Sequence, residues 1–284
     1  MIGPDRLDRV SAAAAVPEQV TAYVRAVAGS KPKLWGDCIG YESDGAIVLV
    51  GYPLHDPRDA SAMTEAVDLV LKTPGLQRLT VIGPVRPPQA PQQAAAVEDC
   101  YYALPLPGPA PGPKLRNLLR RASREASLAH GERLDEDHNA LIRRYLEERS
   151  LSAGTRHIFQ QLPRYLEASP GALLISARRA DGRLAAFAVG EYASLSTAFF
   201  MFCFRDPGLA PPGSADLVFS GLLQEARERG QTCMNLGLGV SEGIRFFKRK
   251  WGAEPFLPYV EVGWEPAPPG VVSRLGALLR RRPQ

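Results

Sequence analysis

The stretch Thr232–Trp264, TCMNLGLGVSEGIRFFKRKWGAEPFLPYVEVGW, contains the signals of a strand, a glycine turn, a helix and a second strand. Its apolar run Cys233–Leu236 stops at Gly237, as a buried strand bounded by a turn does. Ser241 is a good N-cap for a helix, and Gly252 is placed to end that helix. The stretch therefore predicts a strand that leads through a turn into a short helix and back into a strand.

Lys248 occupies an unusual position on the expected helix. Ile244, Phe247 and Trp251 share one stripe of a helical wheel, and Lys248 lies at the edge of that stripe, about 40° from Ile244. Its basic neighbours point elsewhere: Arg245, Arg249 and Lys250. One interpretation is a surface lysine whose stem covers apolar groups. The other is an ammonium at the mouth of a cleft, where it could stabilise an oxyanion or bind a phosphate.

The same stretch resembles a known family. Within Gly239–Phe256, Phe247-Lys248 followed by Lys250-Trp251-Gly252-Ala253 is similar to the closing segment of the Fem family and its relatives. These are transferases built from tandem GNAT-like domains, and many of them take the aminoacyl group from a charged tRNA. The resemblance implies an acyltransferase.

A second segment carries the same resemblance. Lys114–Ala122, KLRNLLRRA, is similar to the basic helix that opens the second domain of Fem proteins and of the C-terminal domain of bacterial lysylphosphatidylglycerol synthases. Four arginines of this helix are candidates for binding a phosphate-bearing substrate: Arg116, Arg120, Arg121 and Arg124. Because like charges so close together repel one another, an anion would stabilise them. The alternative is a solvated helix face.

The family resemblance implies an α/β (α+β) fold with two tandem GNAT-like domains and mixed central sheets. In this interpretation Lys248 stabilises the tetrahedral intermediate and Phe247 forms a wall of the acyl pocket. The acyl donor is an aminoacyl-tRNA, or an acyl-CoA in the alternative, and no separate cofactor is expected. The remaining candidate substrate-binding residues are Arg205, Gly213, Ser214, Asn235, Arg245 and Trp251.

Composition limits the class of protein and its partners. The chain has 284 residues, which suits two domains, with 45% hydrophobic and 23% charged residues. A net charge of +4 is mild, so an anionic partner needs a local basic patch. We expect a phosphate-bearing substrate rather than DNA. There is no long apolar run and no signal-peptide pattern, so we expect a cytoplasmic protein without a transmembrane segment. The scattered cysteines and histidines predict no metal site.

Periodicity and proline content suggest the domain boundaries. Residues 1–112 predict a degraded GNAT-like domain that ends in a proline-rich linker, and residues 113–265 a C-terminal GNAT-like domain with the active site. Residues 266–284 form a proline- and arginine-rich tail. The expected strands and helices are, in order, helix 17–28, strands 35–41 and 46–52, helix 60–72, strand 79–82, a basic helix from 114, helices 137–150 and 157–166, strands 173–178, 185–192 and 197–204, and helix 216–229.

The loop Arg205–Ser214 bears on the choice of acyl donor. It stands where a CoA-using GNAT domain would bind pyrophosphate with backbone amides, but Pro211 and Pro212 remove donors there. This weakens CoA as the donor, although an acyl-CoA-dependent N-acyltransferase stays the alternative. General bases are poorly marked, because Glu191 and Asp216 stand where carboxylates are usually structural. A non-catalytic module that binds tRNA or anionic lipid is the second alternative.

Overall fold

The computed structural model describes residues 3–266, and the chain divides into two compact units that are not consecutive in sequence. The small unit consists of residues 31–98 together with the end of the chain from residue 259. The large unit consists of residues 2–30 and 99–258. Residues 267–284, which include the expected basic tail, lie outside the described part.

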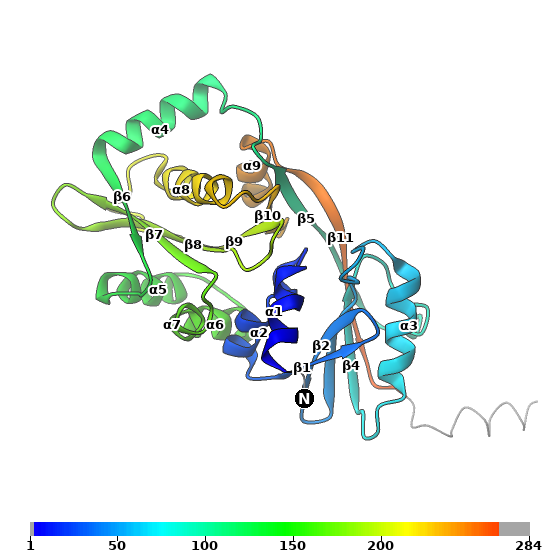
Figure 1. The fold of residues 1–284 in the computed structure, drawn as a ribbon. Coiled ribbons are helices and arrows are strands. Elements are labelled where there is room, and N and C mark those ends of the chain that lie inside the picture. The colour runs from blue at the N-terminus through cyan, green and yellow to red at the C-terminus, as the bar shows by residue number, and fades with distance from the viewer. Residues whose placement is uncertain (1–2, 267–284) are drawn as a thin grey trace, which may run out of the picture. The chain divides into compact units, whose positions relative to one another are not determined.

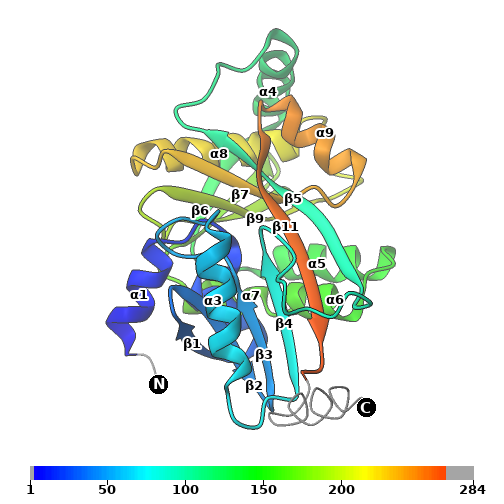
Figure 2. The same ribbon diagram turned by 90° about the vertical axis from the view of Figure 1, so that its right-hand side faces the viewer.

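The small unit is a sheet with one covering helix. Its elements are β1 (Lys31–Trp35), β2 (Cys38–Ser43), β3 (Ala46–Val50), α3 (Ala60–Leu71), β4 (Arg78–Gly83) and the last residues of β11 (Glu254–Trp264). The strand order is β1-β2-β3-β4-β11, in which β3 and β4 are parallel and the other pairs antiparallel. Helix α3 lies against this sheet and buries Val67 and Val70 with Ile47 and Leu79 (Figure 2).

The hairpin expected around residues 42–45 is present. Strands β2 and β3 pair up to Ser43 and Ala46, and the two residues between them have positive φ, 47° at Asp44 and 77° at Gly45. Two successive left-handed residues match the twist of a two-residue hairpin turn. Trp35 differs from expectation, because a turn at Gly36, with φ 58°, separates it from β2 and leaves it in β1.

The large unit contains a six-stranded mixed sheet between two layers of helices (Figure 1). The strand order is β5-β10-β9-β8-β7-β6, and only β9 and β10 are parallel. The strands are β5 (Ala96–Pro105), β6 (Ala126–Gly131), β7 (Ala172–Arg179), β8 (Leu184–Glu191), β9 (Thr197–Arg205) and β10 (Cys233–Leu238). The helices are α1 (Pro4–Ala12), α2 (Thr21–Ala28), α4 (Pro113–Glu125), α5 (Glu136–Glu148), α6 (Ala153–Gln160), α7 (Leu162–Ala168), α8 (Ser214–Glu228) and α9 (Glu242–Lys250).

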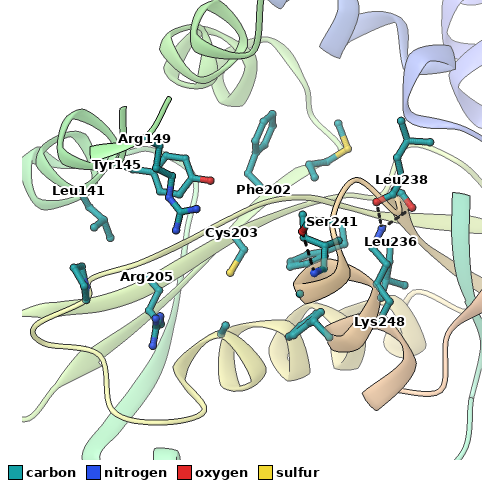
Figure 3. A pocket seen from close by; sticks show the side chains of 18 of the residues that line it. Leu141, Tyr145, Arg149, Phe202, Cys203, Arg205, Leu236, Leu238, Ser241 and Lys248 are labelled. Atoms are coloured by element: carbon teal, nitrogen blue, oxygen red, sulfur yellow. Dashed lines mark hydrogen bonds between the residues drawn. The ribbon is translucent and has the colours of Figure 1, made fainter. Parts of the chain in front are cut away.

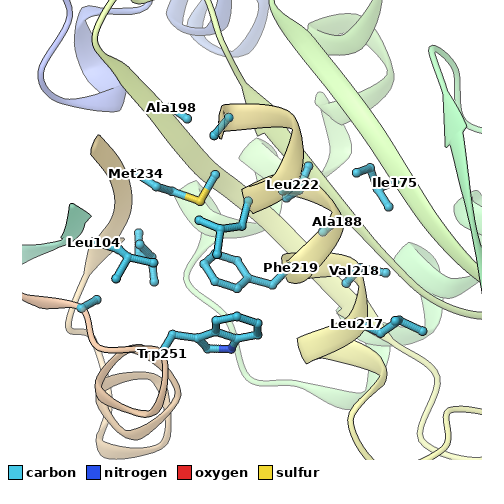
Figure 4. Packing of buried hydrophobic residues seen from close by; sticks show 14 of the residues in the cluster. Leu104, Ile175, Ala188, Ala198, Leu217, Val218, Phe219, Leu222, Met234 and Trp251 are labelled. Atoms are coloured by element: carbon cyan, nitrogen blue, oxygen red, sulfur yellow. The ribbon is translucent and has the colours of Figure 1, made fainter. Parts of the chain in front are cut away.

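Each face of the large sheet has its own core. On one face α8 buries Phe219 and Leu222 against Met234 and Trp251 (Figure 4). On the other face α5, α6 and α7 cover a second cluster, which includes Phe187. Both faces of the central strands are therefore buried, which explains the long apolar runs of β8 and β9.

The N-terminal helices belong to the large unit, so the expected division near residue 113 does not coincide with the observed units. Val20 is buried with Phe199 of β9, and the side-chain amide of Asn235 donates to the carbonyl of Ala15 at 2.9 Å. Sequence patterns could not indicate this, because the partners are about 180 to 220 residues away along the chain.

Two further elements differ from expectation. The helix expected over residues 157–166 is two helices, α6 and α7. Pro163 lies in the first turn of α7, where a proline is tolerated, and could not continue α6. Strand β6 was not predicted; it follows α4 directly and pairs with β7. No helix within residues 3–266 combines the length and the apolar character that crossing a bilayer requires.

Candidate active site

A cleft of about 600 Å³ opens in the large unit where β9 and β10 separate. The two strands pair in parallel as far as Phe199 and Asn235, and the residues beyond these no longer pair with each other. The cleft is lined by the free ends of both strands, by one face of α5 and by α9 (Figure 3). Separated carboxyl ends of neighbouring parallel strands are a common place for ligands.

The turn between β10 and α9 is held by an acidic residue that sequence reasoning missed. The Asp99 carboxylate accepts hydrogen bonds from the backbone N–H groups of Gly239 at 3.1 Å and Val240 at 2.9 Å. Val240 has φ 41°, which is rare for a β-branched residue and indicates a constrained turn. Asp99 stabilises this turn and so fixes the start of α9.

Lys248 lies deeper than the sequence predicted. Its side chain is 2% exposed, and its Nζ donates to the carbonyl oxygens of Gly237 and Leu238, each at 2.6 Å (Figure 3). The expected position at the cleft mouth is therefore corrected to a buried position on the cleft lining. Burial lowers the pKa of this lysine to about 8, and the negative charge of Asp99 opposes part of that effect.

Phe247 forms part of the cleft wall. Its ring stacks on Phe200 with centroids 6.0 Å apart and meets Phe219 edge-on at 5.5 Å. Trp251, by contrast, does not line the cleft: it is buried, and its indole N–H donates to Asp216 at 2.9 Å. Trp251 is thus a core residue rather than a substrate contact.

Arginines gather at the other end of the cleft from Lys248. Arg205, a predicted substrate-binding residue, lies at this end with Arg149 (Figure 3), and Arg144 is also part of the cleft lining. Arg144 is paired with the buried Asp206 at 2.9 Å, whereas the Arg149 guanidinium lies 4.5 Å from the centre of the Tyr145 ring. The cleft thus has a lysine at one end and two arginines, Arg149 and Arg205, at the other.

The contribution of α5 was missed by sequence reasoning, although a signal was present. The cleft-lining residues of this segment are Leu141, Arg144, Tyr145, Glu148 and Arg149. Their spacing of three, four, seven and eight residues defines one face of a helix. That face mixes apolar and charged residues, which hides it from a search for a purely apolar stripe.

Four other predicted substrate-binding residues do not line the cleft. The hydroxyl of Ser214 donates to the carbonyl of Pro211 at 2.7 Å, and Gly213 is the N-cap of α8 with φ 91°. Asn235 is fully buried and holds Ala15, and Arg245 pairs with Glu242 at 3.1 Å. These contacts give all four residues structural roles.

The arginines of α4 also lie away from the cleft lining. All four are exposed, and within residues 3–266 three of them make local contacts: Arg116 with the Pro111 carbonyl, Arg120 with Asn117 and Arg121 with Glu125. Arg124 is exposed as well. The basic helix and the cleft are therefore separate features of the large unit.

The start of α8 is poorly suited to pyrophosphate. A side chain of α4, Leu118, lies 2.8 Å from the point where a Cβ of Gly213 would stand, so α4 covers this helix end. The carboxylate of Asp216 in the first turn accepts from Trp251 and, at 2.6 Å, from Lys250. A negative charge already occupies the end of the helix dipole that would attract a phosphate.

The buried carboxylate of Glu191 and the thiol of Cys203 are poorly suited to act as a general base. Glu191 is fully buried and accepts four hydrogen bonds, from Tyr165, Ser169 and the backbone N–H groups of Tyr192 and Ala193. The Cys203 thiol lines the cleft, and burial raises its pKa to about 12, so it stays protonated. Among the described residues, no group of histidines, cysteines and carboxylates could hold a metal ion.

Comparison with known proteins identifies the fold of the chain. Residues 113–249 match the family described as acetyltransferase (GNAT) domain, and no curated protein matches the chain. The structure of FemX is similar with a TM-score of 0.65 at 10% identity, covering 99% of both chains.

Two solved structures of the lysylphosphatidylglycerol synthetase type are also similar. One is the C-terminal domain of a putative lysylphosphatidylglycerol synthetase from Agrobacterium fabrum, with a TM-score of 0.63 at 15% identity, covering 97% of this chain and 95% of that chain. The other is L-PGS from Bacillus licheniformis, with a TM-score of 0.50 at 15% identity, covering 94% of this chain and 98% of that chain. At these identities the likeness shows the fold, and it confirms the fold expected from the sequence.

Proposed function

We propose that this chain, whose residues 113–249 form a GNAT-fold domain, is an acyltransferase that moves an aminoacyl group from aminoacyl-tRNA to an amine or hydroxyl acceptor. One observation carries the proposal. A buried lysine, Lys248, lies beside an aromatic wall in the cleft where β9 and β10 separate, and its ammonium is held by two backbone carbonyls.

The position of Lys248 suits the chemistry of acyl transfer. Attack on an ester carbonyl places a negative charge on the carbonyl oxygen, and a positive donor held in a fixed position stabilises that charge. Two N–H groups of the ammonium are engaged by Gly237 and Leu238, which fixes the direction of the remaining one. The rings of Phe247 and Phe200 then provide an apolar wall for the acyl group.

As the acyl donor, an aminoacyl-tRNA suits this cleft better than an acyl-CoA does. Pro211 and Pro212 lack N–H groups, Leu118 covers Gly213, and Asp216 holds negative charge in the first turn of α8. A pyrophosphate needs that helix end free and positive. An aminoacyl ester does not need it, because its adenosine and phosphates can be held elsewhere.

Two basic regions could hold the nucleic acid part of the donor. Arg149 and Arg205 line the open end of the cleft and could meet the phosphate nearest the ester. The exposed arginines of α4 form a second region that could contact phosphates further along the strand. Contacts of this kind give affinity that depends steeply on salt.

Acyl-CoA is the alternative donor, because Ala215 in the first turn of α8 does line the cleft. The deciding experiment incubates the protein with radiolabelled aminoacyl-tRNA pools and, separately, with labelled acetyl-CoA, using Lys248→Met as the matched control. We expect label transfer or faster deacylation from one aminoacyl-tRNA, and loss of both in the variant. Transfer from acetyl-CoA alone would establish the alternative. Silence with both donors would leave a module that binds tRNA or anionic lipid.

A further inference from the structure

The bonding of the Lys248 amine leaves it a single free position. A tetrahedral nitrogen bonded to its own Cε has three other positions, and two of these hold hydrogens donated to the Gly237 and Leu238 carbonyls at 2.6 Å. These acceptors are backbone atoms of the strand end that lines the cleft, so they cannot rotate away. The third position can carry either a proton or a lone pair.

We propose that Lys248 is the general base of the acyl transfer as well as its oxyanion donor, passing one proton from the acceptor to the leaving oxygen through this third position. This inference rests on the function proposed above and adds a second role for the same residue. A separate base is then not required, which agrees with the engaged state of the buried carboxylates Glu191 and Asp216.

The proton balance of the reaction is complete. The neutral amine accepts a proton from the acceptor nitrogen or oxygen as that atom forms its bond to the acyl carbon, and the carbonyl π electrons move to oxygen. The new ammonium then donates its third N–H to the oxyanion. When the tetrahedral intermediate collapses, the bond between the acyl carbon and the ribose oxygen breaks, and the same proton moves to that oxygen. Lys248 returns to its neutral form.

The surroundings of Lys248 make its neutral form accessible. Burial lowers its pKa to about 8, so about a tenth of the molecules carry the neutral amine at pH 7. The charged and titratable groups that face it come from β5 and α9. Asp99 and Cys100 raise the pKa of Lys248 and so favour the ammonium. Arg245 acts on Cys100, whose pKa its positive charge lowers. The Tyr102 ring centre lies 5.3 Å from Nζ, and the pKa of Tyr102 is raised, so this ring stays neutral.

One other group could act as the base. Glu148 is exposed and lines the cleft, and no hydrogen bond or ion pair holds it among the described residues. It serves as the matched comparison, because Glu148→Gln removes this carboxylate and leaves Lys248 and its two carbonyl acceptors intact. The base role of Lys248 requires that the pH dependence of the reaction survive this change.

The first test does not depend on activity. Lysine Nζ and Cε resonances are followed by NMR from pH 6 to 11, with Lys248→Met identifying the signal of Lys248. We expect this signal to titrate near pH 8, separate from the surface lysines above pH 10. Titration of Lys248 above pH 10 would overturn the proposal, since almost no neutral amine would exist at neutral pH.

The second test measures kcat/KM against pH with the aminoacyl-tRNA donor. We expect kcat/KM to rise with pH up to about 8 in the wild type and in Glu148→Gln. Lys248→Arg keeps a positive charge, but a guanidinium does not give up its proton. The kcat/KM of this variant should therefore be at least 100-fold lower than that of the wild type. Small primary amines added to Lys248→Ala should restore turnover, with a rate that increases with amine basicity. The rescue of Lys248→Ala tests the base role even if Lys248→Arg does not fold.

The outcomes separate the two proposals. Transfer that persists in a folded Lys248→Arg, or amine rescue that is independent of basicity, would overturn the base role and leave the acyltransferase intact. A loss of at least 100-fold in kcat/KM in Glu148→Gln, with Lys248→Arg still active, would assign the base to Glu148 instead. Absence of transfer from every aminoacyl-tRNA would overturn the proposed function, and the base role with it, even where Lys248 titrates near 8.

Discussion

The burial of Lys248 should be measurable as a pH dependence of stability. In the unfolded chain a lysine has its ordinary pKa of 10.5, whereas in the folded chain the pKa is about 8. Below pH 8 the ammonium is present in both states, and the folded state carries the full cost of burying it. Between these two pKa values the unfolded chain binds more protons, so stability rises with pH.

The magnitude follows from the two pKa values. Their difference of about 2.5 corresponds to about 3 kcal/mol of unfolding free energy, of which about 2 kcal/mol is gained by pH 9.5. Lys248→Met removes the titrating group and hence this gain. The difference in unfolding free energy between wild type and variant should therefore grow by about 2 kcal/mol from pH 7 to pH 9.5 in favour of the wild type.

The assay is urea unfolding of both proteins, followed by tryptophan fluorescence at closely spaced pH values. Taking the difference between them cancels the other groups that titrate in this range. Arg249→Met is the control, because it removes a positive charge from the same helix and keeps Lys248. The unfolding free energy of this variant should change with pH in parallel with that of the wild type. Parallel curves for Lys248→Met would refute the reasoning, since they would mean that the folded lysine has an ordinary pKa.

Three further predictions concern activity and binding. Lys248→Met should lower kcat by about 100-fold or more with little change in KM in steady-state assays, and Arg249→Met should be nearly silent; equal effects of the two would contradict the catalytic role. Acetyl-CoA should bind more weakly than the low-micromolar range in calorimetry, and tighter binding would favour the CoA-dependent alternative. Reversal of Arg120 and Arg121 to glutamate should weaken tRNA binding and flatten its salt dependence, and unchanged affinity would leave α4 as a solvated face.

Elements with strong local signals were predictable from the sequence. Helix α8 was expected over residues 216–229 and spans Ser214–Glu228, and β9 was expected over 197–204 and spans Thr197–Arg205. In α8 the apolar positions repeat with the period of a helix, whereas β9 is a continuous apolar run of the length of a buried strand. The region of Phe247 and Lys248 was predicted for the same reason, because the N-cap Ser241 and the apolar stripe define a short helix.

The roles of several side chains were not predictable, because their partners are distant in sequence. Trp251 shares a stripe with Phe247 on a helical wheel, yet its indole is committed to Asp216 on α8. Asn235 is held by Ala15, 220 residues earlier. The depth of Lys248 depends on Gly237 and Leu238 turning their carbonyls toward it, and a sequence pattern does not contain that information.

Because each unit is built from segments that are not consecutive in sequence, the order in which the chain is synthesised affects when each unit can fold. Residues 3–30 are made before all the elements of the large unit on which they pack, which include α6, α7, β9 and β10. Strand β4 likewise keeps an open edge until Val260–Trp264 has been made. An unpaired strand edge invites pairing with other chains. The small unit cannot be completed before Val260–Trp264 has been made, so a nascent chain should expose this strand edge until then.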